Sequence, residues 1–293
     1  MILLMVSDPQ KIAFTLIHCN VRSLVVALHS EPLQQLQHLD LHRHHISATN
    51  VLPHSGKQRS FSGVRNTKRA RESAMQKFDT PAPISAVLAI PAGRIQFIAA
   101  DRADTTVEVL PADRSKSRDV KTAEQTTVDY ADGVLRIRTP QNQLFGPSGS
   151  LEVTVQLPAG SHVEAKTGAC ELRGVGRLGD VAFEGAYRQT KIDEAASVRL
   201  AAIDGDVEVG RLNGPAEIST TRGDIRIAEA VRGAVVLSTQ SGDISIVAAA
   251  GVSAALDAGT GYGRVSNALK NDGTAELDIR ATTSHGDISA RSL

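Results

Sequence analysis

A short signature recurs seven times between residues 168 and 290, and this repeat limits the folds open to the chain more than any other feature. Each copy has a turn residue, a small or polar residue, and then an apolar–polar–apolar triplet, as in Gly205-Asp-Val-Glu-Val209. Successive copies start 20, 17, 18, 19, 21 and 23 residues apart. No copy is long enough to bury its own apolar side, so the copies must stack and share one core. They begin at Gly168, Arg188, Gly205, Gly223, Gly242, Gly263 and Gly286.

Within each copy, apolar and polar residues alternate, which is the period of a β-strand with one buried face. A second alternating strand precedes most copies, as in "AEIST" (216–220). Two or three short strands per copy, without an apolar stripe of helical length, predict an all-β fold: a β-solenoid of about seven short rungs over residues 158–293. The side chains expected to face inward are those of Cys170, Leu172, Thr190, Ile192, Val207, Val209, Ile225, Ile227, Ile244, Ile246, Val265 and Ile288. Their expected partners in the second strands are Val198, Leu200, Ala216, Ile218, Val235, Leu237, Leu256, Leu277 and Ile279.

Residues 75–157 alternate in the same way but without a fixed repeat, and they predict an irregular antiparallel strand region that leads into the solenoid. Its strands are expected at "AVLAI", "RIQFI", "TTVEVL", "TTVDY", "VLRIR" and "LEVTVQL". Asp132-Gly133 separates two of them. This dipeptide favours a type I′ hairpin turn, because both central residues of that turn need a positive φ.

Residues 1–74 differ in composition from the rest of the chain. They carry nine Lys and Arg against four Asp and Glu, whereas residues 75–293 carry twenty-three against twenty-eight. Much of this N-terminal extension is polar, basic and without a period, so we expect it to be largely disordered. Met75 is the only methionine after Met5, and one hypothesis is that residues 1–74 result from a mis-assigned start.

The segment "LPAGSHVEAKTGACELRGVGRLGDVAFEG" (157–185), together with the later Gly-Asp-Ile and Gly-Asp-Val units, resembles the bacterial putative-adhesin family of β-strand-repeat proteins, a domain of unknown function. The resemblance covers about residues 75–293. It implies a β-solenoid whose molecular function is unassigned, and it brings no catalytic residues with it. The chain departs from the family pattern at Arg188, where Gly is expected, and at Arg264, where Asp is expected.

The Gly-Asp pairs at the starts of the copies are interpreted as a structural ladder of turns. Gly supplies a positive φ, and Asp is expected to hydrogen-bond the backbone of its own turn. The alternative is a row of carboxylates that binds Ca²⁺, but Arg264 interrupts that row. We therefore expect neither metal nor cofactor. Arg222 precedes one pair and completes an Arg-Gly-Asp tripeptide, but only the Arg is particular to that copy. The pairs are Gly205-Asp206, Gly223-Asp224, Gly242-Asp243 and Gly286-Asp287.

The remaining residues give few indications of a binding partner or a reactive group. The formal net charge is zero, which gives no reason to expect nucleic acid as a partner. Cys19 and Cys170 are the two cysteines, which favours a reducing compartment over a disulfide framework. Aromatic residues are scarce, and stacking platforms for bases need them. Tyr187, Arg188 and Tyr262 remain as candidate exposed interaction residues.

These observations predict a non-enzymatic scaffold or protein-interaction module, with no catalytic residues. The chain shows no convincing signal peptide and no run of about 18 apolar residues, so no membrane span and a cytoplasmic location are expected. The last copy ends near Leu293 without a visible cap. The rung around Ile288 is therefore expected to pair with another copy or a partner protein. The alternatives are an exported surface adhesin and, less favoured, a β-helix enzyme that acts on polysaccharide and needs clustered acids and bases.

Overall fold

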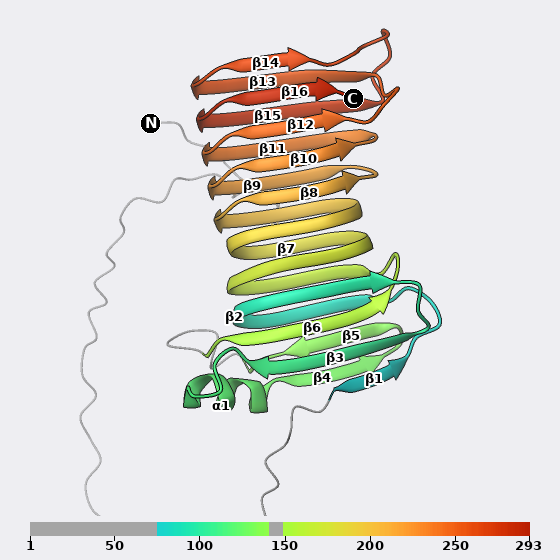
Figure 1. Cartoon of the computed structure of the whole chain (residues 1–293), viewed down its shortest axis with the longest axis vertical. Helices are drawn as coiled ribbons and strands as arrows, with labels where there is room; N and C mark the ends of the chain where they lie inside the picture. The colour runs from blue at the N-terminus through green and yellow to red at the C-terminus, as the bar shows by residue number, and fades with distance from the viewer. Residues whose placement is uncertain (1–74, 141–148) are drawn as a thin grey trace, which may run out of the picture. The chain divides into compact units, whose positions relative to one another are not determined.

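The computed structural model describes residues 75–140 and 149–293, so the expectations for residues 1–74 lie outside it. The described residues form a stack of short strands that coil around one continuous apolar core (Figure 1). They contain a single helix, α1 (Ser117–Gln125). The expected all-β solenoid is confirmed.

The strands that precede the repeat combine parallel and antiparallel pairs. β2 (Ser85–Ala100) runs parallel to β5, β6 and β7. The antiparallel pairs are β1 with β3, β3 with β6, and β4 with β5. All six strand patterns expected here are strands, and parallel stacking already begins at Ser85. The bounds are β1 (Gln76–Asp79), β3 (Asp104–Pro111), β4 (Thr127–Ala131), β5 (Val134–Arg138) and β6 (Leu151–Pro158).

The hairpin between β4 and β5 has the turn that the sequence predicts. Asp132 has a φ of 51° and Gly133 a φ of 75°, so both central residues are in the left-handed region. A type I′ turn needs this conformation at both positions. The Asp-Gly dipeptide therefore sets the register of this pair.

From residue 162 to residue 248 the chain advances along the stack in one direction and lays each strand on the preceding one. β7 (His162–Asp204) winds through two copies of the repeat without a break (Figure 1). Later rungs have two strands each, paired in parallel and in register: Ile225 lies between Val207 and Ile244. Like side chains therefore form columns. The bounds are β8 (Val207–Leu212), β9 (Ala216–Arg222), β10 (Ile225–Ala230), β11 (Gly233–Ser241), β12 (Ile244–Ala248), β13 (Ala254–Tyr262), β14 (Val265–Ala268), β15 (Leu277–His285) and β16 (Ile288–Ser292).

The columns of alternating residues make the core. Every side chain expected to face inward is buried, except those of Val265 and Leu256. Val265 is 46% exposed and Leu256 is half-buried. Both exceptions belong to the rung of β13 and β14, which points to a special place for this rung in the stack.

The last two rungs are stacked in a different order from their order in the sequence. β15 lies between β11 and β13, and β16 lies between β12 and β14. Ile288 in β16 is therefore inside the stack and fully buried. The expectation that this rung ends the stack is wrong, and the rung of β13 and β14 lies at that end (Figure 1). Because all rungs offer similar backbone edges, a late rung can insert between two earlier ones.

The opposite end of the stack is closed by side chains. Phe78 of β1 and Tyr130 of β4 meet there, with ring centroids 5.4 Å apart. At the same end, α1 packs against β3 and β6 (Figure 1). The buried carboxylate of Asp119 holds this helix by accepting the backbone N–H groups of Asp113 and Ser150. The residues of α1, "SRDVKTAEQ", have no apolar stripe, so the sequence did not predict this helix.

Candidate functional site: the turn ladder and the open end

The Asp side chains of the Gly-Asp turns form a ladder along one edge of the stack. Oδ1 of Asp206 accepts a hydrogen bond from the backbone N–H of Asp224 at 2.9 Å, and Asp224 accepts one from Asp243 at 2.7 Å. Asp243 in turn accepts one from Asp287 at 2.7 Å. The turn pattern predicted that each Asp would bond the backbone of its own turn. Stacking instead brings the N–H of the neighbouring rung within reach, so these bonds tie rung to rung.

Arg264 ends this ladder. Its backbone N–H donates to Oδ1 of Asp287 at 2.9 Å, and its guanidinium lies 3.2 Å from Oδ2. The backbone bond, followed by the side-chain bond, lowers the pKa of Asp287. Among the described residues no rung lies beyond Arg264, so no further N–H needs a carboxylate there. This explains why Arg replaces the Asp that the repeat leads one to expect.

The glycines of the turns pack against one another's carbonyl groups. A Cβ added to Gly242 would lie 2.1 Å from the carbonyl oxygen of Gly223, and Gly242 itself has a φ of 151°. Arg188 occupies the equivalent position one rung before Gly205 and adopts a φ of 98°. The turn is thus preserved without Gly, at a strain of about 1–3 kcal/mol. Arg188 is exposed, so its side chain meets no obstacle.

Threonines on the inner side of the same turns donate hydrogen bonds to the glycine carbonyl groups. Oγ1 of Thr239 donates to the carbonyl of Gly223 at 3.2 Å. Thr283 donates to Gly242 at 3.1 Å, and Thr260 donates to the carbonyl of Gly286. This second ladder was not among the features predicted from the sequence. The signal was present, because a Thr stands three residues before the turn glycine in four copies (Thr220, Thr239, Thr260 and Thr283).

The Arg-Gly-Asp tripeptide at residues 222–224 is part of these ladders. The Arg222 guanidinium contacts the Asp204 carboxylate of the neighbouring rung at 3.1 Å. Gly223 and Asp224 make the glycine and aspartate contacts of their rung. All three residues are therefore tied to neighbouring rungs, whereas a presented recognition loop would leave them free.

The candidate interaction residues are exposed but do not form one site. Tyr187 is 45% exposed and Tyr262 is 75% exposed. Tyr262 stacks on His285, with ring centroids 5.1 Å apart and planes 13° from parallel. Tyr187 and Arg188 belong to β7, whereas Tyr262 belongs to the terminal rung, so several rungs separate them. Only Tyr262 lies on the rung of β13 and β14.

The terminal rung leaves its inner face partly open. Val265 is 46% exposed, whereas Ile288, the residue in register with it on β16, is fully buried. Asn267 stands at an inward position that is Ile246 in β12, and it is exposed. We define the exposed inner side chains and the outer backbone edge of β13 and β14 as the open end.

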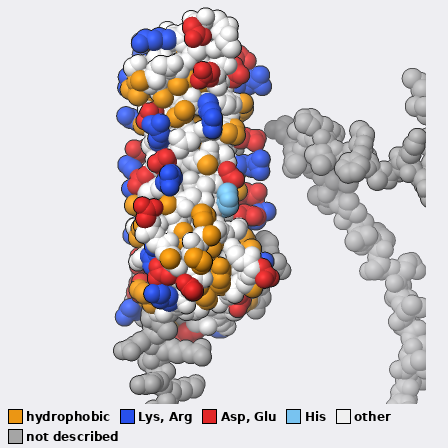
Figure 2. Space-filling model, turned by 90° about the vertical axis from the view of Figure 1, so that its right-hand side faces the viewer, with side chains coloured by type: hydrophobic (Ala, Val, Ile, Leu, Met, Phe, Trp, Pro, Cys, Tyr) orange, Lys and Arg blue, Asp and Glu red, His pale blue; other side chains and the backbone are white. Residues whose placement is uncertain are grey.

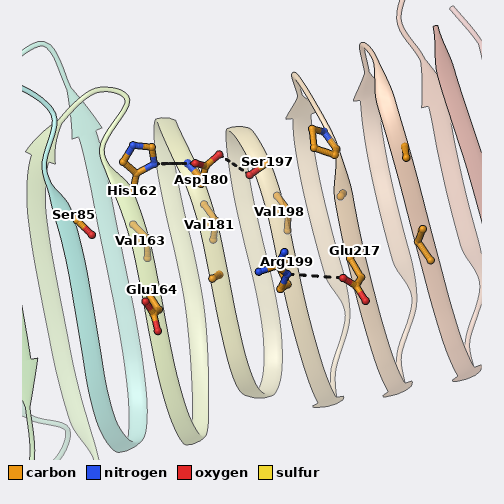
Figure 3. Close-up of a pocket in the computed structure, with 15 residues that line it drawn as sticks. Ser85, His162, Val163, Glu164, Asp180, Val181, Ser197, Val198, Arg199 and Glu217 are labelled. Atoms are coloured by element: carbon orange, nitrogen blue, oxygen red, sulfur yellow. Dashed lines mark hydrogen bonds and ion pairs between the residues drawn. The ribbon is translucent and has the colours of Figure 1, made fainter. Parts of the chain in front are cut away.

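A shallow groove runs across several rungs on one face of the stack, with a volume of about 560 Å³. His162, Asp180 and Ser197 lie in a row along it (Figure 3). Asp180 accepts the Ser197 hydroxyl at 2.6 Å, and its backbone N–H donates to Nδ1 of His162 at 3.1 Å. The carboxylate thus stands between Ser and His, whereas a nucleophilic triad places His beside Ser. Nδ1 of His162 also lies 3.2 Å from Oδ2 of Asp180.

Charged side chains on the outer faces pair mainly between neighbouring rungs. Lys191 contacts Glu208 at 2.9 Å, and Arg173 contacts Asp193 at 2.8 Å. Figure 2 shows acidic and basic side chains interleaved along one side of the stack. The side chains of these two pairs are partly buried, and ion pairs near a protein surface contribute about 0–1 kcal/mol each. The interleaved charges leave no broad surface of a single charge on this side.

The other candidate chemistry is confined to single residues. Cys170 is fully buried, and burial raises the pKa of its thiol to about 12, so the reactive thiolate is suppressed. Within residues 75–140 and 149–293, no three His, Cys, Asp or Glu side chains are grouped so as to hold a metal ion. No helix in that part of the chain has the length and apolar character needed to cross a membrane.

The fold and the ladders define a class of β-strand-repeat proteins built as a parallel stack. Residues 88–291 match the family described as Toastrack DUF4097, and the chain belongs to this family. Its molecular function is unknown. A comparison with curated proteins finds no match.

Solved structures of low sequence identity are also similar to this chain. A putative adhesin from Bacteroides fragilis has 15% identity and a TM-score of 0.45, over 75% of this chain and 98% of that one. A putative cell adhesion protein from Clostridium sporogenes has 11% identity and a TM-score of 0.30, over 76% and 100%. A putative lipid binding protein from Parabacteroides distasonis has 14% identity and a TM-score of 0.39, over 73% and 96%.

Proposed function

We propose that this protein is a non-enzymatic scaffold that pairs with a second copy of itself through the open end. The observation that carries the proposal is the contrast between two residues in register. Val265 in the terminal rung is 46% exposed, whereas Ile288 beside it is fully buried. An apolar position that is buried in the other rungs is thus left for another chain to cover.

The backbone of β14 supports strand addition at this end. Ile288 N–H donates to the carbonyl of Arg264, so the backbone groups of Val265, the next residue, point away from β16. An exposed row of such groups is a template for pairing with another strand. Two copies related by a twofold axis would pair β14 with β14 in antiparallel fashion. With Ser266 on the axis, Val265 would lie opposite Asn267 and Arg264 opposite Ala268, which avoids placing like charges together.

The other end of the stack favours a closed dimer over a filament. It ends in the short strands β1 and β4, whose Phe78 and Tyr130 rings already cover the core. Its edge strands therefore lack the exposed inward side chains of the open end. With one self-complementary surface per copy, association is isologous and stops at two copies.

The test is the mass of the full chain in solution as its concentration rises. Sedimentation velocity should show a monomer–dimer equilibrium for the wild type. V265K places two lysines in the paired interface and should shift the protein to monomer. V236K is the matched control, because Val236 is 38% exposed on the outer face of β11, away from the open end. A wild type that stays monomeric, or equal effects of V265K and V236K, would overturn the proposal.

A further inference from the structure

The C-terminal rung, residues 277–292, fills a slot between two rungs that precede it in the sequence. On one side it pairs with β11 and β12, and on the other side with β13 and β14. Its inward side chains are buried, with Leu277, Ala281 and Ile288 fully so. The chain thus builds both walls of the slot before it supplies the segment that fills it.

The two faces of this rung repeat the same contacts. Asp287 N–H bonds to Asp243, and the Asp287 carboxylate accepts the N–H of Arg264. Thr283 bonds to the carbonyl of Gly242, and Thr260 bonds to that of Gly286. None of these contacts identifies which copy of the chain supplied the rung.

The connection that leads into the slot runs over the surface. Residues 270–274 are exposed, and Gly273 has a φ of 107°. Hydrogen bonds hold this segment to Ser253, Ala254 and Ser292, among them Ala254 N–H to the carbonyl of Lys270 at 3.0 Å, Glu276 N–H to the carbonyl of Ser253 at 2.9 Å and Lys270 N–H to Ser292 Oγ at 3.0 Å. An exposed connection whose bonds are made to solvent-accessible loop residues can serve as the hinge for exchange of an identical element between copies once these bonds open.

We propose that the C-terminal rung is exchangeable, so that two copies of this chain fill each other's slot with residues 277–292. In the exchanged dimer the ladder, the threonine bonds and the buried apolar contacts of this rung are all kept. Only the path of residues 269–276 changes. This interface is distinct from the open end, and it does not depend on the proposed pairing there.

The test uses two variants of the full chain, each with one new cysteine in a C19S background. Ser245 and Ser289 are in register, exposed or half-exposed, and their Oγ atoms lie 3.5 Å apart. S245C and S289C are mixed, incubated at high concentration in mild denaturant, returned to buffer and treated with a short bis-maleimide. Exchange places the new thiol of S245C in one copy beside the new thiol of S289C in the other. A covalent heterodimer should therefore form in an amount that rises with concentration.

The matched control is a mixture of S219C and S238C. Ser219 and Ser238 are also in register on neighbouring strands, but both lie outside the exchanged segment, so this mixture should give no heterodimer. V265K added to all variants separates the two proposals, because it blocks pairing at the open end and leaves the slot intact. Absence of heterodimer from S245C and S289C, or equal cross-linking in the control mixture, would overturn rung exchange.

Discussion

The backbone N–H of Asp287 donates to Oδ1 of Asp243 at 2.7 Å, although the two residues are 44 positions apart in the sequence. In a stack that followed the sequence, the neighbour of Asp243 would be Arg264. The contact shows that the last rung has inserted between two earlier ones. Because each turn presents an acceptor carboxylate and a donor N–H, the ladder fixes the register between neighbouring rungs, but it does not fix which rungs are neighbours.

The close packing of the turn glycines against carbonyl groups predicts that two Gly→Ala substitutions will lower stability by very different amounts. At Gly242 the new Cβ would lie 2.1 Å from the Gly223 carbonyl oxygen, in a backbone with a φ of 151°. We expect G242A to lower the free energy of unfolding by more than about 3 kcal/mol, since strain at such a φ alone costs about 1–3 kcal/mol. Urea denaturation followed by circular dichroism measures this difference.

Gly259 provides the control for that experiment. It lies in β13, and an added Cβ would have no atom within 4 Å. G259A should therefore change stability by less than about 1 kcal/mol, and a small gain is expected because Ala restricts the unfolded chain. Equal losses for G242A and G259A would show that the close approach of the turn glycines is not needed for stacking.

Most of the fold could be predicted from the alternation and the repeat. The period of two located the strands and the inward columns, and the Gly-Asp pairs located the turns. The order of the rungs could not be predicted, because Asp243 offers the same carboxylate to either Asp287 or Arg264. The copy at Gly263 departs from the repeat at two positions: Arg264 replaces Asp, and Asn267 replaces an apolar residue. Both residues suit an exposed rung, so these departures indicate that the copy lies at the end of the stack.

The helix α1 and the contacts of the candidate site were harder to read from the sequence. α1 has no apolar stripe, and the buried carboxylate of Asp119 holds it through bonds to the backbone of Asp113 and Ser150. Those bonds depend on the tertiary arrangement. The row of His162, Asp180 and Ser197 likewise follows from the register of neighbouring coils, and no local motif marks it.

Because β16 lies inside the stack and β14 lies at its end, truncating two residues in register should lower the free energy of unfolding by different amounts. Ile288 is fully buried, so I288A should lower the free energy of unfolding by about 2–5 kcal/mol. V265A removes a smaller side chain that is already 46% exposed, and it should cost less than about 1 kcal/mol. Guanidinium denaturation of the two variants compares these costs. A higher cost for V265A than for I288A would contradict the observed position of β16 inside the stack.

The aspartate ladder predicts that an acceptor oxygen, and not the negative charge, is what Asp243 supplies to the next rung. D243A leaves the Asp287 N–H without its side-chain acceptor and should cost about 1 kcal/mol. D243N keeps an oxygen at the same place and should recover more than half of that loss. Thermal and urea denaturation of the pair measure the difference. If D243N were as unstable as D243A, the contribution of Asp243 would come from its charge.

The ion pairs of Asp104 predict a dependence of stability on acid pH. Hydrogen bonds from Arg102 and then Lys77 lower the pKa of Asp104 from 3.8 to about 2. Because the folded state lowers this pKa, the ionised carboxylate stabilises the protein fully above pH 4, and this contribution is lost as the pH falls from about 4 to about 2. Urea midpoints measured between pH 5 and pH 2 should fall less steeply for R102M than for the wild type. R94M, which removes an exposed Arg elsewhere on the stack, should keep the wild-type slope, and a parallel pH profile for R102M would show that Arg102 does not hold the carboxylate in its ionised form.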